Sequence, residues 1–305
     1  MDPSLIGETA ALLASFLWTF NSLFFTNAGK KIGALSVNAY RIAIAVILLA
    51  FTHVLFLGTA LPAATDEQWF WMGLSGIVGL GIGDIGLFAA FVIIGPRLSL
   101  LMMSLSPIFA SFVAYLMLDE VISPLAVIGI AITLAGVTLV ILERGNNSTM
   151  DSASKNHRSW GVFLALVGAI GQGVGLVFSK KSIYLDPNTV LNPISATLIR
   201  MTVAALFVWA CVVVAGKFSR LRRALKDRNA IKNTAAGAFL GPFLGVTFSM
   251  VAVTYTEAGI AQTLMSLMPL LIIPIVWLLY NERTNWRGIL GATIAVVGVA
   301  ILFLM

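Results

Sequence analysis

The sequence contains little charge, little histidine and almost no cysteine. Its 305 residues include one cysteine, Cys211, and two histidines, His53 and His157. One cysteine cannot build a disulfide framework or a zinc ribbon, and two histidines leave little for an imidazole metal site. Charged residues make up 10% of the chain and hydrophobic residues 59%, whereas about 25% of an ordinary soluble domain is charged. The composition therefore excludes a water-soluble globule, and we expect neither a metal nor a cofactor.

Sequence motifs for nucleotide chemistry are also missing. No Gly-x-x-x-x-Gly-Lys-Ser/Thr sequence is present, so no nucleotide-hydrolysing domain is expected. The segment 81–86 satisfies the dinucleotide pattern Gly-x-Gly-x-x-Gly, but it lies inside an apolar run instead of between a strand and a helix. The N-terminus lacks the basic region of a signal peptide, so the first apolar run is expected to stay in the protein.

Long apolar runs occupy most of the chain. A helix needs roughly 20 apolar residues to cross the hydrocarbon layer, and open strands cannot cross it. The alternating pattern of an outer-membrane barrel is absent. We therefore predict an all-α polytopic membrane protein with ten transmembrane helices. The expected helices cover residues 5–27, 37–57, 69–93, 98–118, 124–142, 160–183, 193–215, 233–255, 259–280 and 286–304.

The basic residues are divided unequally between the two sides of the membrane. With ten spans both termini share a side whose connections carry only Lys180 and Lys181, whereas the opposite connections carry fifteen of the 19 Lys and Arg. Because cytoplasmic loops are enriched in Lys and Arg, both termini are predicted to lie outside. The basic segment 217–232 is most simply a topology anchor instead of a lipid or nucleic-acid site. Arg41 and Arg200 fall inside spans, where snorkelling to headgroups is favoured over a substrate carboxylate, at least for Arg41.

An internal repeat relates the two halves of the chain. A shift of 162 residues aligns glycines, a Met-Ser-Leu-x-Pro segment and a glutamate. With slightly shorter shifts, Trp18 matches Gln172 and Arg41 matches Arg200. The pairs at the longer shift are Gly79 with Gly241, Gly83 with Gly245, 103–107 with 265–269, Glu120 with Glu282, Gly129 with Gly291, and Gly136 with Gly298.

Each repeat contains five predicted helices. The repeats cover 1–142 and 160–305, and the hydrophilic segment 143–159 links them. Because five is odd, the second repeat enters the membrane from the opposite side, so the two repeats are inverted. This architecture is typical of secondary transporters, in which the substrate binds near the midplane between the halves.

The paired motifs resemble those of the ten-helix EamA family of the drug/metabolite transporter superfamily. The resemblance rests on Ser-Leu-x-Pro at 104–107 and 266–269, on Glu120 and Glu282, and on the glycines of the fifth helix of each half. It implies export of small metabolites, often amino acids, through a cavity lined by the first, third and fourth helices of each half. It also implies cytoplasmic termini, in conflict with the charge count above.

Asp84 is the acid that lies deepest in a predicted span. It interrupts an uncharged run from Gln68 to Pro96. An ionised group at that depth costs at least about 2.5 kcal/mol, so Asp84 is expected to face a cavity or a partner. We expect it to bind substrate or to couple transport to protons; the alternative is a hydrogen bond that holds helices together.

Proline and glycine mark positions of bending and close packing. Pro107 and Pro269 lie in the middle of two predicted helices, where each removes a backbone hydrogen bond and frees a carbonyl, so both are candidate hinges or packing kinks. Glycines spaced three or four apart in the third helix of each half are expected to admit a neighbouring helix. Glu120 and Glu282 are expected to cap helices or tie loops.

Other polar, aromatic or sulfur-containing side chains fall within the helices that would line the cavity. Buried amides need partners, which a substrate, a water or a neighbouring helix can supply. With Asp84, the candidate substrate-binding residues are Trp18, Asn21, Met103, Ser106, Gln172, Tyr255, Gln262 and Met265.

Together these features predict a secondary active exporter of small metabolites such as amino acids, driven by a proton gradient or by solute exchange. A multidrug or nucleotide-type carrier is the alternative. An intramembrane enzyme and a channel are less favoured, because no catalytic motif and no pore loop is present. The expected partners are a small-molecule substrate and the lipid bilayer, without nucleic acid, and the protein is expected in a bacterial-type inner membrane as a monomer or weak homodimer.

Overall fold

The computed structural model describes residues 3–94, 99, 102–143, 155–185, 190–268, 270–271 and 286–303. Within these residues every regular element is a helix, which confirms the all-α prediction. Six helices are long and apolar enough to cross a membrane, and three shorter apolar helices accompany them. The six are Pro3–Ile32, Leu35–Leu57, Asp66–Ala90, Ser159–Ile183, Pro193–Val214 and Arg228–Tyr255.

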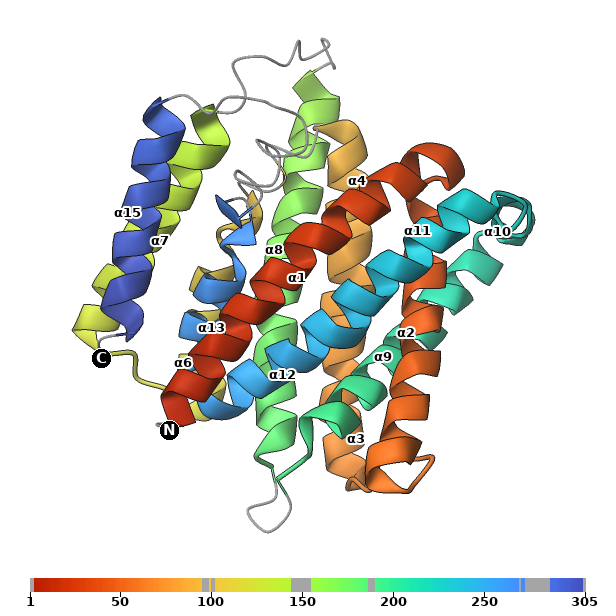
Figure 1. Ribbon diagram of the computed structural model, residues 1–305, viewed down its shortest axis with the longest axis horizontal. Coiled ribbons are helices and arrows are strands. Elements are labelled where there is room, and N and C mark those ends of the chain that lie inside the picture. The colour runs from red at the N-terminus through yellow and green to blue at the C-terminus, as the bar shows by residue number, and fades with distance from the viewer. Residues whose placement is uncertain are drawn as a thin grey trace.

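The helices follow the predicted order along both halves of the chain (Figure 1). The first half contains α1 (Pro3–Ile32), α2 (Ala34–Leu57), α3 (Asp66–Ser75), η1 (Gly76–Gly83), α4 (Asp84–Ile93), α6 (Ser106–Leu118) and α7 (Pro124–Glu143). The second half contains α8 (Lys155–Ile183), α9 (Pro193–Val214), α10 (Phe218–Ala224), α11 (Arg228–Ala238), η2 (Phe239–Gly245), α12 (Val246–Tyr255), α13 (Ala258–Met265) and α15 (Trp286–Phe303).

The third helix of each half contains a π-helical segment, which the sequence did not predict. In the first half α3, η1 and α4 run without a break from residue 66 to 93, and in the second half α11, η2 and α12 run from 228 to 255. The two ranges differ by the 162 residues of the repeat, and η1 and η2 end at the matched glycines Gly83 and Gly245. Short π-helical segments inside α-helices occur often at functional sites.

Side-chain caps fix where several helices begin. Thr65 and Gln68 form a capping box at α3, in which the Thr65 side chain accepts from the Gln68 backbone and the Gln68 side chain accepts from Thr65. Asp227 caps α11 by accepting from Ala230 N at 2.9 Å. Ser123 Oγ accepts from Ala126 N at 3.1 Å at the start of α7. These contacts satisfy amide donors that have no partner within the helix.

The two halves interlock through their first helices. α1 packs against α11, η2, α12 and α13 of the second half, whereas α8 packs against α3, η1, α4 and α6 of the first. The second helices, α2 and α9, contact each other, and so do the fifth helices, α7 and α15, which form a pair at one edge in Figure 1. Each half therefore completes the packing of the other.

Glycines allow these crossed helices to approach closely, as predicted. A Cβ on Gly175 of α8 would lie 2.9 Å from Gly79 Cα, and a Cβ on Gly171 would lie 2.8 Å from Gly83 Cα. In the equivalent interface the side chain of Trp18 lies against Gly245, where a Cβ would overlap it. A larger residue at these glycines would separate the helices.

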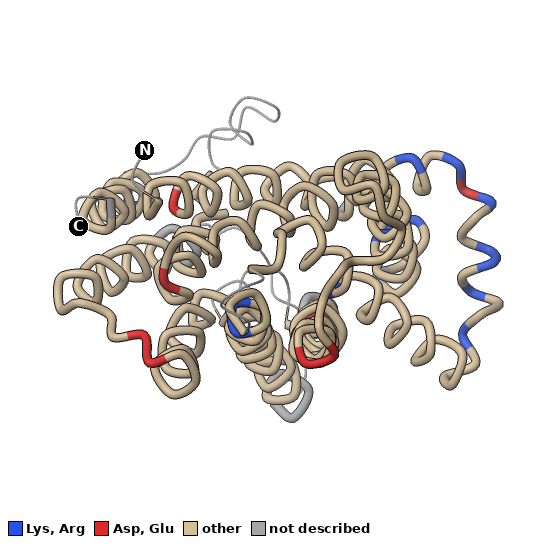
Figure 2. The backbone as a smooth tube through the Cα atoms, turned by 90° about the horizontal axis from the view of Figure 1, so that it is seen from below, with Lys and Arg blue, Asp and Glu red and all other residues tan. Residues whose placement is uncertain are grey.

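The chain ends and a group of basic residues lie at opposite ends of the molecule. The N- and C-termini lie together at the lower left of Figure 1, while α10 lies at the upper right. Figure 2 shows Lys and Arg gathered at that second end. This arrangement agrees with the unequal division of charge, and the assignment of that end to the cytoplasm stays a prediction.

Two features of the described helices differ from the predicted spans. The first predicted span, 5–27, contains an acid, Glu8, that is 6% exposed within α1 and that the apolar pattern did not single out. The helix α10 was not predicted, because a helix of 7 residues is too short to produce an apolar span. Residues 272–285, which belong to the ninth predicted helix and the connection that follows it, lie outside the described residues.

Candidate functional site

A carboxylate held by both halves lies at the centre of the candidate site. Asp84, 6% exposed, is the first residue of α4, directly after the π-helical segment. Its Oδ2 is ion-paired with Nη2 of Arg41 from α2. Its Oδ1 accepts from Nε2 of Gln172, which lies on α8 of the second half, at 2.8 Å. The same amide nitrogen donates to Gly79 O at 3.2 Å, so Gln172 fixes the carboxylate against the π-helical backbone.

Arg41 points into the protein, and the prediction that it snorkels to headgroups was wrong. Its side chain is 11% exposed, and its Nε donates to Asn38 Oδ1 at 2.9 Å. The guanidinium carbon lies 5.5 Å from the Phe25 ring centroid and 5.0 Å from that of Phe88. An ion pair combined with two aromatic faces gives the guanidinium strong partners inside the bundle, so it does not need the headgroup layer.

Arg200 of α9 is the second cation beside Asp84. It is 3% exposed, which also excludes snorkelling. It interacts electrostatically with Asp84, and a Cβ on Gly79 would lie 2.8 Å from its Nη2, so a side chain at residue 79 would crowd the guanidinium. Among the described residues, none accepts a hydrogen bond from Arg200 Nε. This guanidinium therefore keeps a donor that no described residue uses.

The two arginines are matched by the internal repeat, but the aspartate is not. Arg41 and Arg200 occupy equivalent positions in the second helix of each half. The residue 162 positions after Asp84 is Val246. Two cations therefore converge on one carboxylate, and the cluster of Arg41, Asp84, Gln172 and Arg200 carries a net positive charge when Asp84 is ionised. We call these four residues the central cluster. Buried charges of this kind are expensive in a bilayer and are typical of functional sites.

A second polar group joins the halves near the chain termini. Glu120 accepts from Ala258 N at the start of α13 at 2.9 Å and is ion-paired with Lys180. Lys180 Nζ also donates to Thr256 O at 2.6 Å, and Tyr184 Oη donates to Thr254 O. The expected capping role of Glu120 is confirmed, although the helix it caps belongs to the other half. Glu282 lies outside the described residues.

The fourth helix of the first half is interrupted where a hinge was expected. Pro107 lies in the first turn of α6, so the prediction that it sits in the middle of one helix was wrong. A turn precedes it, in which Leu105 N donates to Met102 O at 3.1 Å and Ile108 N donates to Leu105 O at 3.0 Å. Proline is favoured in a first helical turn, because its missing donor has no partner there anyway. Pro269 lies outside the described residues.

The remaining predicted residues are distributed around the helix interfaces. Trp18 and Asn21 pack on Gly245 and Gly241 of η2. Gln262 and Met265 are 8% and 2% exposed within α13. Tyr255 was expected to be buried but is 44% exposed at the end of α12, so that expectation was wrong.

Ser106 and Met103 flank the break before α6. Ser106 is fully buried, and its hydroxyl has no hydrogen-bond partner among the described residues. Met103 is half-buried. The structure thus brings Gln172 to Asp84 but does not join the other predicted side chains directly to this pair.

His53, whose imidazole could suggest catalysis or metal binding, has structural partners instead. His53 contacts Thr59 O at 2.7 Å through Nδ1 and Ser195 Oγ at 3.0 Å through Nε2, which ties α2 to α9. No group of three His, Cys, Asp or Glu that could hold a metal occurs in the part of the chain that the structure describes.

A family comparison decides what kind of protein carries this site. The model of the EamA-like transporter family matches residues 5–142 and 159–304, once in each half. The chain belongs to the EamA-like transporter family. As an EamA-like transporter it is an integral membrane transporter and not an enzyme, and its two family domains agree with a repeat architecture.

The fold of this EamA-like transporter also resembles a solved structure. A crystal structure described only as that of a protein matches with a TM-score of 0.76 at 16% sequence identity, over 99% of this chain and 96% of the other. At that identity the likeness concerns the fold alone. No curated protein matches the chain.

Proposed function

We propose that this EamA-like transporter is a secondary active exporter of small metabolites such as amino acids, working by alternating access with Asp84 as its coupling carboxylate. The observation that carries the proposal is that Asp84 is bound from both halves, by Arg41 of the first and Gln172 of the second. A movement of α8 relative to α4 must break or remake the bond between Gln172 and Asp84. The central cluster therefore links charge to the relative position of the halves.

The charge of the central cluster offers two ways to drive this movement. A proton on Asp84 would weaken its ion pair with Arg41. A substrate carboxylate would supply a second anion for the two arginines, and the unused Nε donor of Arg200 supports that role. The first corresponds to proton coupling and the second to exchange of anionic solutes. In the first case the proton neutralises Asp84, and in the second the substrate anion competes with Asp84 for the same arginines.

Replacement of Asp84 by asparagine tests the coupling role. In proteoliposomes that contain equal amounts of folded protein, Asp84→Asn should abolish transport driven by a pH gradient. Asp66→Asn is the matched control, because Asp66 is an exposed acid at the start of the same continuous helix. Unchanged pH-driven transport in Asp84→Asn would remove this carboxylate from the mechanism, even if the protein is a carrier.

Trans-stimulation tests whether the protein is a carrier at all. External unlabelled solute should accelerate the exit of internal labelled solute, because a carrier returns faster when loaded. Linear flux without saturation would instead identify a channel. The net positive charge of the central cluster also favours organic anions in general, so a nucleotide-type metabolite is the second candidate. Comparing amino acids with nucleotides as labelled solutes separates the two.

We further propose that the protein lies in a bacterial-type inner membrane, as a monomer or weak homodimer, with both termini outside. The unequal distribution of Lys and Arg supports this orientation. A C-terminal reporter that is active only in the cytoplasm should stay inactive. An active reporter would reverse the orientation and would leave the carrier mechanism unaffected.

A further inference from the structure

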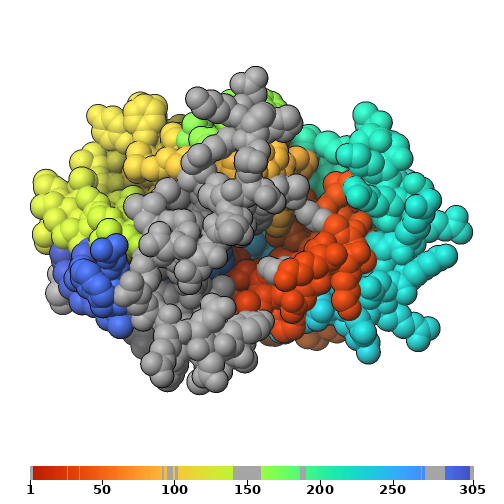
Figure 3. Space-filling view, turned by 90° about the horizontal axis from the view of Figure 1, so that it is seen from above, coloured from red at the N-terminus to blue at the C-terminus, as the bar shows by residue number. Residues whose placement is uncertain are grey.

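A basic cleft lies between the end of α1 and the turn that joins α10 to α11. Its volume is about 1050 Å³. Residues 29–33 form one wall, and the other is formed by residues 220, 223, 224 and 226–229. Figure 3 shows the end of α1 beside the segment that contains α10 and α11. The cations that line it are Lys30, Lys31, Arg220, Arg223, Lys226 and Arg228.

The positive charge of the cleft is not neutralised within the described part of the protein. The one acid in its lining is Asp227, whose carboxylate accepts from Ala230 N at the start of α11. Ion pairs among the described residues join Arg41 to Asp84 and Lys180 to Glu120, so none involves a cleft cation. Six cations therefore face one acid that is already engaged, so the cleft is strongly basic and would attract an anion.

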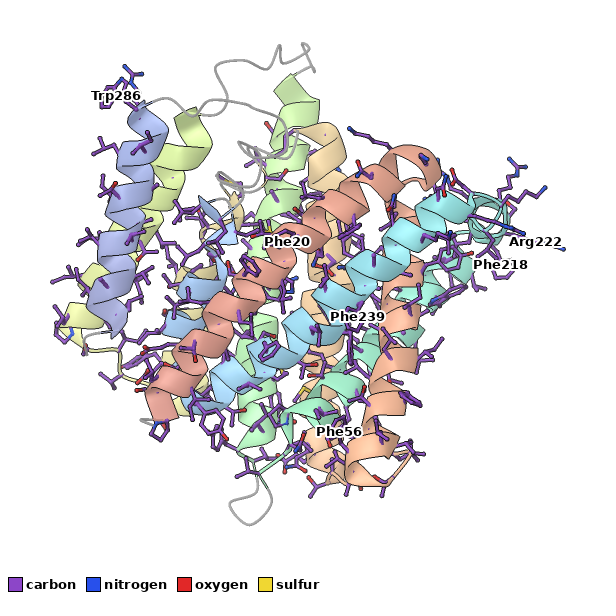
Figure 4. All side chains as sticks on the ribbon, viewed as in Figure 1. Phe20, Phe56, Phe218, Arg222, Phe239 and Trp286 are labelled. Carbon is purple, nitrogen blue, oxygen red and sulfur yellow. The ribbon has the colours of Figure 1, made fainter. Side chains whose placement is uncertain are left out.

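Exposed apolar side chains lie directly beside these cations. Phe218 and Leu225, which flank the cleft residues of α10, are 56% and 54% exposed, and Val214 at the end of α9 is 89% exposed. Figure 4 shows Phe218 and Arg222 on α10 at this end of the molecule. Leu221 is 1% exposed, and its carbonyl accepts from Tyr40 Oη at 2.8 Å. The hydrogen bond from Tyr40 thus fixes α10 to α2 at the end of the spans. The outer surface of α10 presents cations and apolar side chains next to each other.

We propose that this cleft binds the headgroup of an anionic phospholipid. The phosphate would lie among the six cations, and the acyl chains would pass over Phe218, Leu225 and the end of α9. A free phosphate or a nucleotide would use the cations but would leave these apolar groups in water. An amphipathic, basic helix beside a membrane span is suited to the boundary between headgroups and acyl chains.

This proposal differs from a simple topology anchor in what it requires. A topology anchor depends on the number of cations on one side of the membrane, whatever their position. A lipid site depends on the cations that line the cleft. The chain supplies a matched comparison, because Lys217, Arg222 and Lys232 belong to the same basic segment but do not line the cleft.

Native mass spectrometry of the full-length protein in neutral detergent tests the proposal. The protein would be mixed with equal amounts of phosphatidylglycerol and phosphatidylcholine, and retention of each would be measured. The cleft variant is Arg220→Gln with Arg223→Gln and Lys226→Gln, and the control is Lys217→Gln with Arg222→Gln and Lys232→Gln. Each cation near an anionic headgroup contributes on the order of a fivefold change in binding, so the cleft variant should bind phosphatidylglycerol roughly 100-fold more weakly. The control should bind as the wild type does.

Three results would overturn the proposal: equal weakening in both variants, equal retention of the two lipids by the wild type, or displacement of the lipid by inorganic phosphate at similar concentration. The last would identify a site for free phosphate. A measurement on the wild type alone covers the case in which a variant does not fold. Phosphatidylglycerol that carries a photoreactive group next to its phosphate should label residues 29–33 and 218–229, and labelling confined to other segments would contradict the proposal.

Discussion

Gln172 Nε2 lies 2.8 Å from Asp84 Oδ1, so a helix of the second half holds the carboxylate that Arg41 of the first half neutralises. The internal repeat shows which residues of the other half correspond to this contact. Gln172 matches Trp18, which packs on Gly245, and Gln172 itself lies beside Gly83, the partner of Gly245 in the repeat. The interface of α8 with η1 and that of α1 with η2 are therefore equivalent, and only the first is followed by a charged residue, Asp84, where the second has Val246.

The ion pair between Arg41 and Asp84 should make a large and non-additive contribution to stability. Arg41→Gln leaves a buried carboxylate without its ion pair, which costs roughly 3–5 kcal/mol. In Arg41→Gln combined with Asp84→Asn both charges are gone, so the double variant should unfold at a higher denaturant concentration than Arg41→Gln alone. Unfolding in mild detergent, followed for the wild type, both single variants and the double variant, measures the coupling. Additive effects would show that the pair is not energetically linked.

Arg200 should distinguish substrates by charge. Hydrogen bonds to charged groups contribute about 1.5–3 kcal/mol, so Arg200→Gln should weaken transport of a carboxylate substrate roughly 10- to 100-fold. Transport of the corresponding amide should change far less. The measurement is kcat/KM for an amino acid and its amide in proteoliposomes. An equal loss for both compounds would mean that Arg200 has only a structural role.

The glycine interface between α8 and η1 should not tolerate even one methyl group. Gly175→Ala places a Cβ 2.9 Å from Gly79 Cα, and overpacking of this kind costs roughly 1–3 kcal/mol. Gly29→Ala is the control, since a Cβ there meets nothing within 4 Å and alanine favours the helix by roughly 0.5–1 kcal/mol. The melting temperature should fall in the first variant and stay equal or rise in the second. A lower value in both would locate the effect outside this interface.

The raised pKa of the Tyr184 phenol leads us to expect a loss of stability at high pH. Partial burial, with Tyr255 and Glu120 nearby, raises the pKa of the Tyr184 phenol above its ordinary value of 10.0. The folded protein therefore keeps this proton at a pH where the unfolded chain has begun to lose it. The stabilisation is fully present below about pH 10 and declines as pH rises through the folded pKa. Melting temperatures between pH 8 and pH 11 should fall more steeply for the wild type than for Tyr184→Phe, and parallel curves would contradict this assignment.

The sequence was most informative where one pattern occurs twice. The 162-residue repeat predicted that α3 to α4 and α11 to α12 are equivalent, and their ends differ by this interval. The depth of Asp84 followed from the absence of other charges near it in the chain. These predictions depend on local composition and spacing, which a single sequence records directly.

The predictions that were wrong depend on where a side chain points or on partners distant in the chain. Arg41 turns inward because Asp84 lies 43 positions away in sequence but beside it in space. The two arginines were aligned by the repeat, but no local pattern gives the direction of a guanidinium. Pro107 fits equally well inside a helix as a kink and at its start. The apolar pattern around it does not separate these cases.

The crossed packing of the first helices has a consequence for biosynthesis. α1 leaves the ribosome before any of its partners in α11, α12 and α13 exists, and α3 and α4 are complete before α8 can cover their glycines. During synthesis the first half must therefore reside in lipid with its close-packing surfaces bare. Because α7 of the first half pairs with α15, neither half can reach its final form until translation has passed residue 303, the end of α15. A fragment that stops at residue 142 should therefore be recognised by membrane proteases as incomplete.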